Sequence, residues 1–212
     1  MRICCISDTH CQAKKIVMPD ADILVHAGDA LVRGEMSELA VFCDWMDRQR
    51  QYDHIIFVAG NHDGCFQDEL TSNQARKMTA GAGVTYLQDD SVTIEGVKFY
   101  GSPWQPEFCN WAFNLPRGHM LREKWKMIPD DTNVLVTHGP PHMIGDTVVD
   151  GRNEGCRDLR TRIDELQHLK LHVFGHIHHS AGLYTMIGKP FVNAAICNER
   201  YAPVNPPIVV DI

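Results

Sequence analysis

The sequence predicts a single α/β domain in which two mixed β-sheets pack face to face as a β-sandwich flanked by helices. Three observations predict this class: short apolar runs rich in Ile and Val, helical periodicity in some of the gaps between them, and alternating runs in the middle and at the end of the chain. The 212 residues suffice for one sizeable core, and no repeat, low-complexity tract or linker divides them. We therefore expect one domain over residues 1–212.

Five apolar runs are expected to be buried strands, because each is short and leads directly into glycine or polar residues. The runs are residues 3–6, 23–25, 55–59, 134–136 and 171–174. In open α/β sheets, ligands bind beyond the carboxyl ends of the strands. The five strand ends are therefore expected to converge on one site.

Periodicity predicts the remaining elements. Apolar residues recur on one helical face near residues 35–50 and again near 154–168. Alternating runs at 84–87, 92–94 and 97–100 predict strands, with Glu95-Gly96 as the turn of a hairpin between the last two. Residues 191–192 and 208–210 predict late strands.

Composition and charge exclude several classes of protein. The formal net charge is −7 and no Lys/Arg cluster is present, so a long nucleic acid is not an expected partner. No apolar run approaches the ~20 residues that cross a bilayer, and the apolar start is too short for a signal-peptide core. The eight cysteines form no CxxC pair and are expected to be free thiols. We expect a cytoplasmic protein without membrane contact; nothing in the sequence indicates its oligomeric state.

Acid, amide and imidazole side chains follow each of the five runs. Asp8 and His10 are two residues apart, so in an extended segment they point to the same side. Alone, each motif competes with an ordinary turn or helix cap. Together, five such clusters at five strand ends would bury many ionisable groups at high cost without a partner. Divalent metal accepts both carboxylate oxygen and neutral imidazole nitrogen, and is the partner we expect.

The full ordered set resembles the five motifs of calcineurin-like metallophosphoesterases and spans most of the chain. The motifs are Asp8-x-His10, Gly28-Asp29, Gly60-Asn61-His62-Asp63, Thr137-His138-Gly139 and Gly175-His176-x-His178. The resemblance implies that family's fold and two divalent cations, manganese first, with iron, zinc, nickel or cobalt as alternatives. It implies one metal on Asp8, His10 and His178, a second on Asn61, His138 and His176, and Asp29 as the bridge.

The resemblance also implies a reaction, which is hydrolysis of a phosphate ester by a hydroxide held between the two metals. His62 is expected to contact the phosphate or to protonate the leaving oxygen, because imidazole does either near neutral pH. Asp63 is expected to orient the backbone or His62 more readily than to act in catalysis.

Further segments are similar to the metallophosphoesterase-domain-containing branch, which is related to small cyclic-nucleotide phosphodiesterases. They are residues 101–106, 113–118, 138–141 and 204–208. The expected substrate contacts are Asn61, His62, Arg33, His142 and Trp104, although a surface position for Arg33 and a plain loop position for His142 are open alternatives. Aromatic residues at 104, 108, 111 and 113 suit either a wall for a nucleobase or a hydrophobic cluster under a loop.

The leading function is therefore a two-metal phosphodiesterase acting on small nucleotides, with cyclic nucleotides among the candidates. A phosphomonoesterase on the same site is the first alternative, since the same metals stabilise both transition states. A weakly active nucleotide-binding or scaffold protein is the second.

Overall fold

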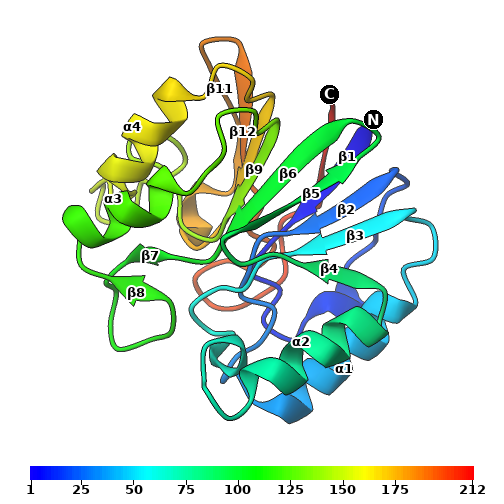
Figure 1. Cartoon of the computed structure of the whole chain (residues 1–212). Helices are drawn as coiled ribbons and strands as arrows, with labels where there is room; N and C mark the ends of the chain where they lie inside the picture. Colours follow the sequence, from blue (N-terminus) through cyan, green and yellow to red (C-terminus); the bar gives the residue numbers. More distant parts are fainter.

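The computed structural model describes residues 1–212 and contains two large β-sheets (Figure 1). The first sheet has the strand order β13-β1-β2-β3-β4, in which β13 is antiparallel to β1 and the other pairs are parallel. Its strands are β1 (Arg2–Ile6), β2 (Ile23–His26), β3 (His54–Phe57), β4 (Val84–Tyr86) and β13 (Ile208–Asp211).

The second sheet has the order β11-β12-β10-β9-β6-β5, with antiparallel pairs at both edges and parallel pairs in the centre. Its strands are β5 (Asp90–Ile94), β6 (Val97–Ser102), β9 (Val134–Thr137), β10 (Leu171–Phe174), β11 (Gly182–Met186) and β12 (Lys189–Asn193). A small parallel pair, β7 (Gln105–Pro106) and β8 (Asn114–Leu115), forms a third sheet.

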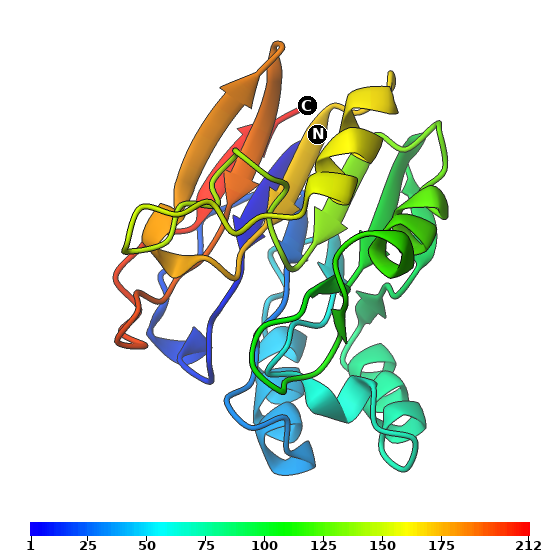
Figure 2. The same cartoon turned by 90° about the vertical axis from the view of Figure 1, so that its left-hand side faces the viewer.

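Helices cover the outer faces of the two large sheets. The α-helices are α1 (Met36–Asp47), α2 (Ser72–Gly81), α3 (His119–Lys126) and α4 (Arg157–Glu165), and the 3-10 helices are η1 (Ala13–Lys15), η2 (Gly64–Phe66) and η3 (His178–Ser180). Figure 1 shows α1 and α2 beside the first sheet, and α3 and α4 at the far side of the second. Figure 2 shows the chain termini side by side, where the backbone N–H of Ile212 donates to the carbonyl of Met1.

Three apolar layers follow from this arrangement. The layer between the sheets contains residues such as Ile3, Val25, Val58, Val136 and Val173, all fully buried. The alternate residues of the strands face outward against the helices in two further layers, one that includes Phe57 and Leu39 and one that includes Leu135 and Leu159. Both faces of the central strands are thus buried, which is why their sequences are continuous apolar runs.

The fold class predicted from the sequence is confirmed: two mixed sheets with outer helices. All five predicted strands are present, and so are the helices near 35–50 and 154–168 and the hairpin turned by Glu95-Gly96. The helices α2 and α3 were not predicted from the sequence; each buries only two side chains. All eight cysteines are free thiols, as expected, and no helix has the length and apolar character to span a membrane.

Candidate metal centre

The seven predicted metal ligands come together where the parallel strands of both sheets end. Asp8, His10, Asp29 and Asn61 follow β1, β2 and β3 of the first sheet, whereas His138, His176 and His178 follow β9 and β10 of the second. Parallel strands present their carboxyl ends at one edge, and the stacked sheets place the two edges together. The ligand-bearing loops, far apart in sequence, therefore face one another.

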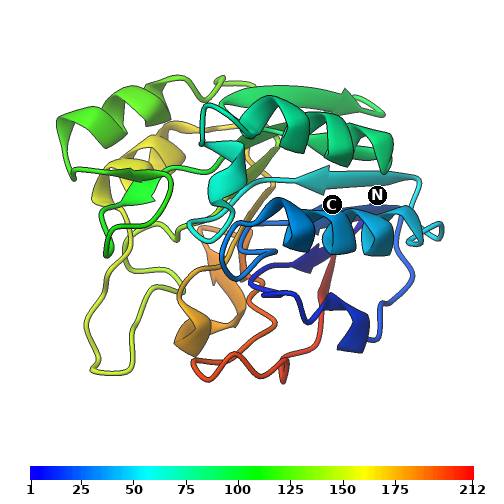
Figure 3. The same ribbon diagram turned by 90° about the horizontal axis from the view of Figure 1, so that it is seen from below.

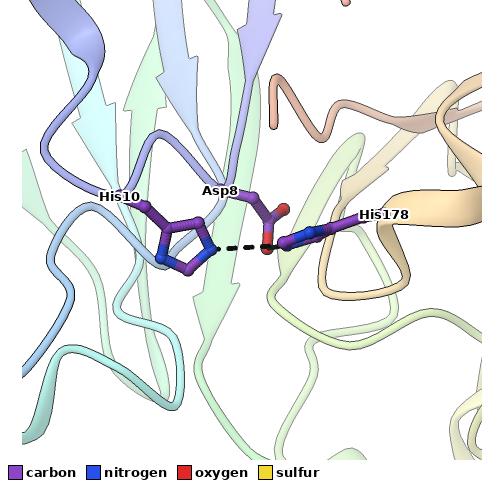
Figure 4. A group of neighbouring side chains, drawn as sticks. All are labelled: Asp8, His10 and His178. Atoms are coloured by element: carbon purple, nitrogen blue, oxygen red, sulfur yellow. Dashed lines mark hydrogen bonds and ion pairs between the residues drawn. The ribbon is translucent and has the colours of Figure 1, made fainter. Parts of the chain in front are cut away.

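One group of possible ligands consists of Asp8, His10 and His178, whose donor atoms all lie within 4.8 Å of one another. Figure 4 shows the Asp8 carboxylate between the two imidazole rings. The Nε2 atom of His178 is 3.1 Å from Oδ1 of Asp8 and 3.3 Å from Nε2 of His10. This is the set predicted for the first metal.

A second group consists of Asp29, His138 and His176, with donor atoms within the same 4.8 Å. Oδ2 of Asp29 lies 3.3 Å from Nε2 of His138 and 3.9 Å from Nε2 of His10, so this carboxylate stands between the two groups. Oδ1 of Asn61 is 3.1 Å from Nε2 of His138. Asp29 therefore lies between the two groups, where the sequence predicts the bridging ligand.

The orientation of the imidazoles fits metal binding. Nδ1 of His10, His138 and His178 lies about a hydrogen-bond length from the carbonyl oxygens of Leu31 (3.0 Å), Ala27 (2.9 Å) and Asn198 (3.0 Å), respectively. A carbonyl only accepts, so each Nδ1 carries a hydrogen, and whenever the ring is neutral its Nε2 lone pair faces the centre. This outer hydrogen bond is the usual partner of a metal-binding histidine.

The close approach of two such lone pairs supports the same conclusion. The Nε2 atoms of His10 and His178 are only 3.3 Å apart, and each offers a lone pair when its ring is neutral. The buried carboxylates of Asp8 and Asp29 face the same space. A cation satisfies all of these acceptors, and the mixed nitrogen and oxygen donor set suits a first-row divalent metal.

The electrostatics of the centre follow from buried acids among imidazoles. Burial alone would raise the pKa values of Asp8 and Asp29, yet the neighbouring His178 and His138 hold them well below the usual range. Conversely, burial would lower the pKa of His138, but Asp29 raises it to about 9. Burial and His138 lower the pKa of His176 to about 3, so this ring is held neutral and ready to bind metal.

Four of the predicted ligands have strained backbone conformations. Asp8, His10, Asp29 and His176 all have positive φ values, of 52°, 40°, 55° and 68°. Such conformations are uncommon for residues other than glycine and cluster at functional sites. Gly175 is required here for a different reason: a Cβ at this position would clash with the side chains of Ser7 and Asp8.

His62 and Asp63 lie beside the ligands and have different surroundings. Nδ1 of His62 donates to the carbonyl of Val32 at 2.6 Å, which leaves Nε2 facing the centre, 4.0 Å from Oδ2 of Asp29. The Asp63 carboxylate is fully buried and accepts from the backbone N–H groups of Gly60, Leu31 and Ala30. Asp63 therefore ties the loop after β2 to the loop after β3.

The sequence and the fold of this chain are similar to those of known proteins. A sequence model described as "Calcineurin-like phosphoesterase" matches residues 1–180. Metallophosphoesterase domain-containing protein 1 of Homo sapiens is 39% identical, over 100% of this chain and 71% of its own length. A UPF0046 protein of Caenorhabditis elegans is 38% identical, over 99% of this chain and 74% of its own length.

The chain belongs to the calcineurin-like phosphoesterase family. Membership supports metal-dependent hydrolysis of a phosphoester, and it implies divalent metal ions, for which the structure has candidate His/Asp binding groups. A solved structure, that of TT1561 from Thermus thermophilus, has the same fold, with a TM-score of 0.61 at 13% identity over 91% of this chain and 88% of the other.

In this calcineurin-like phosphoesterase the centre opens into a cavity of about 850 Å³. Small-molecule sites occupy roughly 300–1,000 Å³, so the cavity suits a substrate of that kind. Of the predicted substrate contacts, Asn61 and His62 line it, whereas Arg33, His142 and Trp104 lie outside it. Trp104 donates from Nε1 to Asp89 and packs against Phe113, and His142 lies 3.4 Å from the buried Asp146 carboxylate beside a smaller hollow.

Two aromatic residues line the cavity: Phe108, one of the aromatics that the sequence offered as a wall for a nucleobase, and Tyr201, which the sequence did not indicate. The Tyr201 ring centroid lies 4.6 Å from that of His10, and the Phe108 ring centroid lies 5.5 Å from that of His176. Phe108 had a sequence signal, as one of four aromatics between residues 104 and 113. Tyr201 had none, because it follows no strand-end motif and reaches the centre only through the fold.

Proposed function

We propose that this chain is a two-metal phosphodiesterase whose substrates are small nucleotides, including cyclic ones. Family membership supports hydrolysis of phosphoesters. The preference for a diester rests on the charges that line the cavity outside the ligand groups.

The observation that carries the diester preference is that both cavity arginines are already paired. Arg117 donates to the carbonyl oxygens of Glu154 (2.7 Å) and Gly155 (2.9 Å), and Arg152 pairs with Asp150 and Glu154. A phosphomonoester carries nearly two negative charges near neutral pH, whereas a diester carries one. A cavity without a free guanidinium therefore favours the singly charged ester.

The side chains around the centre have separate tasks in the proposed reaction. Divalent cations, when bound, supply Lewis acidity and an activated water for in-line attack on phosphorus. Asp8, Asp29, Asn61 and the ligand histidines would hold them. His62 presents Nε2 to the cavity, so its imidazolium can donate a proton to the leaving oxygen or a hydrogen bond to the phosphoryl group.

The proposal is tested by rates on matched ester substrates. Apo protein is loaded with manganese, iron, zinc, nickel or cobalt and assayed on bis-para-nitrophenyl phosphate, para-nitrophenyl phosphate, and 2′,3′- and 3′,5′-cyclic nucleotides. We expect higher kcat/KM on the diesters, with manganese the best activator. A preference for the monoester would contradict the diester assignment and favour a monoesterase.

The same screen separates catalysis from mere binding. If nucleotides bind the metal-loaded chain without turnover, the alternative of a nucleotide-binding or scaffold protein replaces the enzyme. Salt-sensitive binding to duplex DNA would contradict the expectation of a small substrate.

A further inference from the structure

Beyond the metal ligands, the cavity contains an exposed apolar wall. Pro106, Phe108, Pro140, Val148 and Val149 line it, from the β7–β8 segment and from the loop after β9. The Phe108 side chain is 54% exposed and Val149 is 71% exposed. Apolar side chains that stay exposed inside a concave site commonly serve ligand binding.

The loop that carries Phe108 is attached to the metal centre by hydrogen bonds. Nδ2 of Asn114 donates to the Phe108 carbonyl at 2.9 Å, and Oδ1 of Asn114 accepts from Gln105 at 3.2 Å. The same amide group of Gln105, which is buried, donates to Oδ1 of Asn61 at 3.0 Å. Phe108 is therefore placed relative to a ligand of the centre by two intervening side chains.

The second apolar segment is a hairpin with a rigid base. Val148 and Arg152 pair through a backbone hydrogen bond at the tip of this hairpin, residues 147–153. At its base the buried carboxylate of Asp146 accepts from the backbone N–H groups of Met143 and Gly155, both at 2.9 Å, and from Nδ2 of Asn153 at 2.7 Å. In Figure 3 the hairpin and the β7–β8 loop lie at the same side of the molecule.

The charges near this wall decide what it can accept. The cations beside it, Arg117 and Arg152, are paired with protein oxygens, and Glu107, Asp150 and Glu154 line the same cavity. A second phosphate or a carboxylate on the substrate would meet acidic groups without a free cation. A neutral planar ring instead gains contact with the Phe108 ring and with the valines.

We propose that Phe108, with Val148 and Val149, forms a subsite for the nucleobase, and that the enzyme selects esters of neutral planar groups over sugar phosphates and nucleoside triphosphates. This deepens the proposed function and rests on it for the position of the phosphate at the metals. Phe108 acts here as a specificity-determining residue. Its ring lies beside His176, and its side chain has no group that can transfer a proton or bind metal.

The test compares ligands that differ in the base or in the number of phosphates. Binding of adenosine 5′-monophosphate, ribose 5-phosphate and adenosine 5′-triphosphate to the manganese-loaded full chain is measured by calorimetry, with phosphate release followed in parallel. For Phe108→Ala we expect about tenfold weaker binding of the monophosphate, the size of one lost stacking contact. Binding of ribose 5-phosphate should change less than about twofold.

Control variants show whether the loss of binding comes from the aromatic ring of Phe108. Phe108→Tyr retains an aromatic ring and should restore binding of the monophosphate. Val149→Ala should weaken it, whereas Val204→Ala, an exposed valine outside the cavity, should not. Metal content of each variant is measured, so that a damaged centre is recognised.

The outcomes separate the inference from the proposed function. Equal losses for the monophosphate and ribose 5-phosphate, no loss for either, or tightest binding of the triphosphate would overturn the subsite. If the wild type fails to hydrolyse diesters but Phe108→Ala still loses only the base-dependent affinity, the proposed function fails and the subsite stands.

Discussion

The loops that follow the first sheet and those that follow the second sheet bring different chemistry to the metal centre. The first set contributes two carboxylates, an amide and one imidazole, from Asp8, Asp29, Asn61 and His10. The second contributes three imidazoles and no acid, from residues 138, 176 and 178. Neither half alone offers the mixture of donors that both predicted metals require.

Each half also orients the ligands of the other. The Asp8 carboxylate accepts from the backbone N–H of His176 at 3.0 and 3.1 Å. In return, Nδ1 of His138 donates to the carbonyl of Ala27, which follows β2. The centre is therefore a product of sheet packing, and variants that disturb the contact between the halves should affect both metals.

The largest effect is expected at the residue that joins the two halves. Asp29→Asn removes the bridging charge between the two ligand groups, so we expect both metals to be bound weakly and diesterase activity to disappear. Metal stoichiometry by mass spectrometry of the protein and kcat measure this. Loss of one metal only, with activity kept, would show that Asp29 belongs to a single group.

A large effect confined to the first half is expected at His62. His62→Ala removes the proposed proton donor but none of the seven ligands, so kcat should fall by about 10²–10⁴ while metal content stays unchanged. The control is a substrate with a good leaving group, for which the loss should be smaller. An equal loss on every substrate would indicate phosphate binding instead of proton donation.

Intermediate effects, on the free energy of unfolding, are expected at the buried polar side chains that hold the loops of each half in place. Asp63→Ala leaves three buried N–H groups without an acceptor, which we expect to cost about 3 kcal/mol or more. The corresponding residue of the second half is Asn193, whose Nδ2 donates to the carbonyls of Gly145 and Ile177, both at 2.9 Å. Its Oδ1 also accepts from the backbone N–H of Ala195 at 3.3 Å. Asn193→Ala should cost about 2 kcal/mol, because hydrogen bonds of a neutral amide are weaker than those of a carboxylate.

Urea denaturation of the metal-free protein measures both scaffold variants. Asp63→Asn is the control, since its amide oxygen still accepts and should retain part of the stability. If Asn193→Ala proved more destabilising than Asp63→Ala, the second half would depend more on its scaffold than the first.

The smallest effect, taken per pH unit, is a pH dependence of stability in the second half. Burial lowers the pKa of His172 to about 3, so this ring stays neutral in the folded chain while it gains a proton below its ordinary pKa in the unfolded chain. Stability should therefore fall as pH drops below about 6.5, by up to roughly 1.4 kcal/mol per pH unit for this residue. His172→Gln should flatten the dependence between about pH 6.5 and 4.5 in urea titrations.

Much of the fold, and the candidate metal ligands, could be predicted from short stretches of sequence, because strands and the polar residues that follow them are local patterns. A buried parallel strand is a short apolar run, and its polar successors lie at a known edge of the sheet. The helices α2 and α3 escaped the same reasoning. Each buries only two of its side chains, so the apolar pattern within each helix is short.

Substrate contacts could not be predicted as well. Trp104 and Phe108 are four residues apart in one aromatic segment, yet the structure buries much of Trp104 against Phe113 and turns Phe108 into the cavity. Which aromatic faces the centre depends on the path of the loop between β7 and β8. That path is set by long-range hydrogen bonds through Gln105 and Asn114.

The kinds of ligand and the strands that carry them follow from the amino-acid sequence alone, since side-chain chemistry and strand periodicity are local. The grouping of the ligands, and the choice of aromatic side chains that line the cavity, depend on tertiary structure. His10 and His178 meet at 3.3 Å although 168 residues separate them. Such a meeting depends on how two sheets stack, a free-energy balance summed over the whole apolar layer between them.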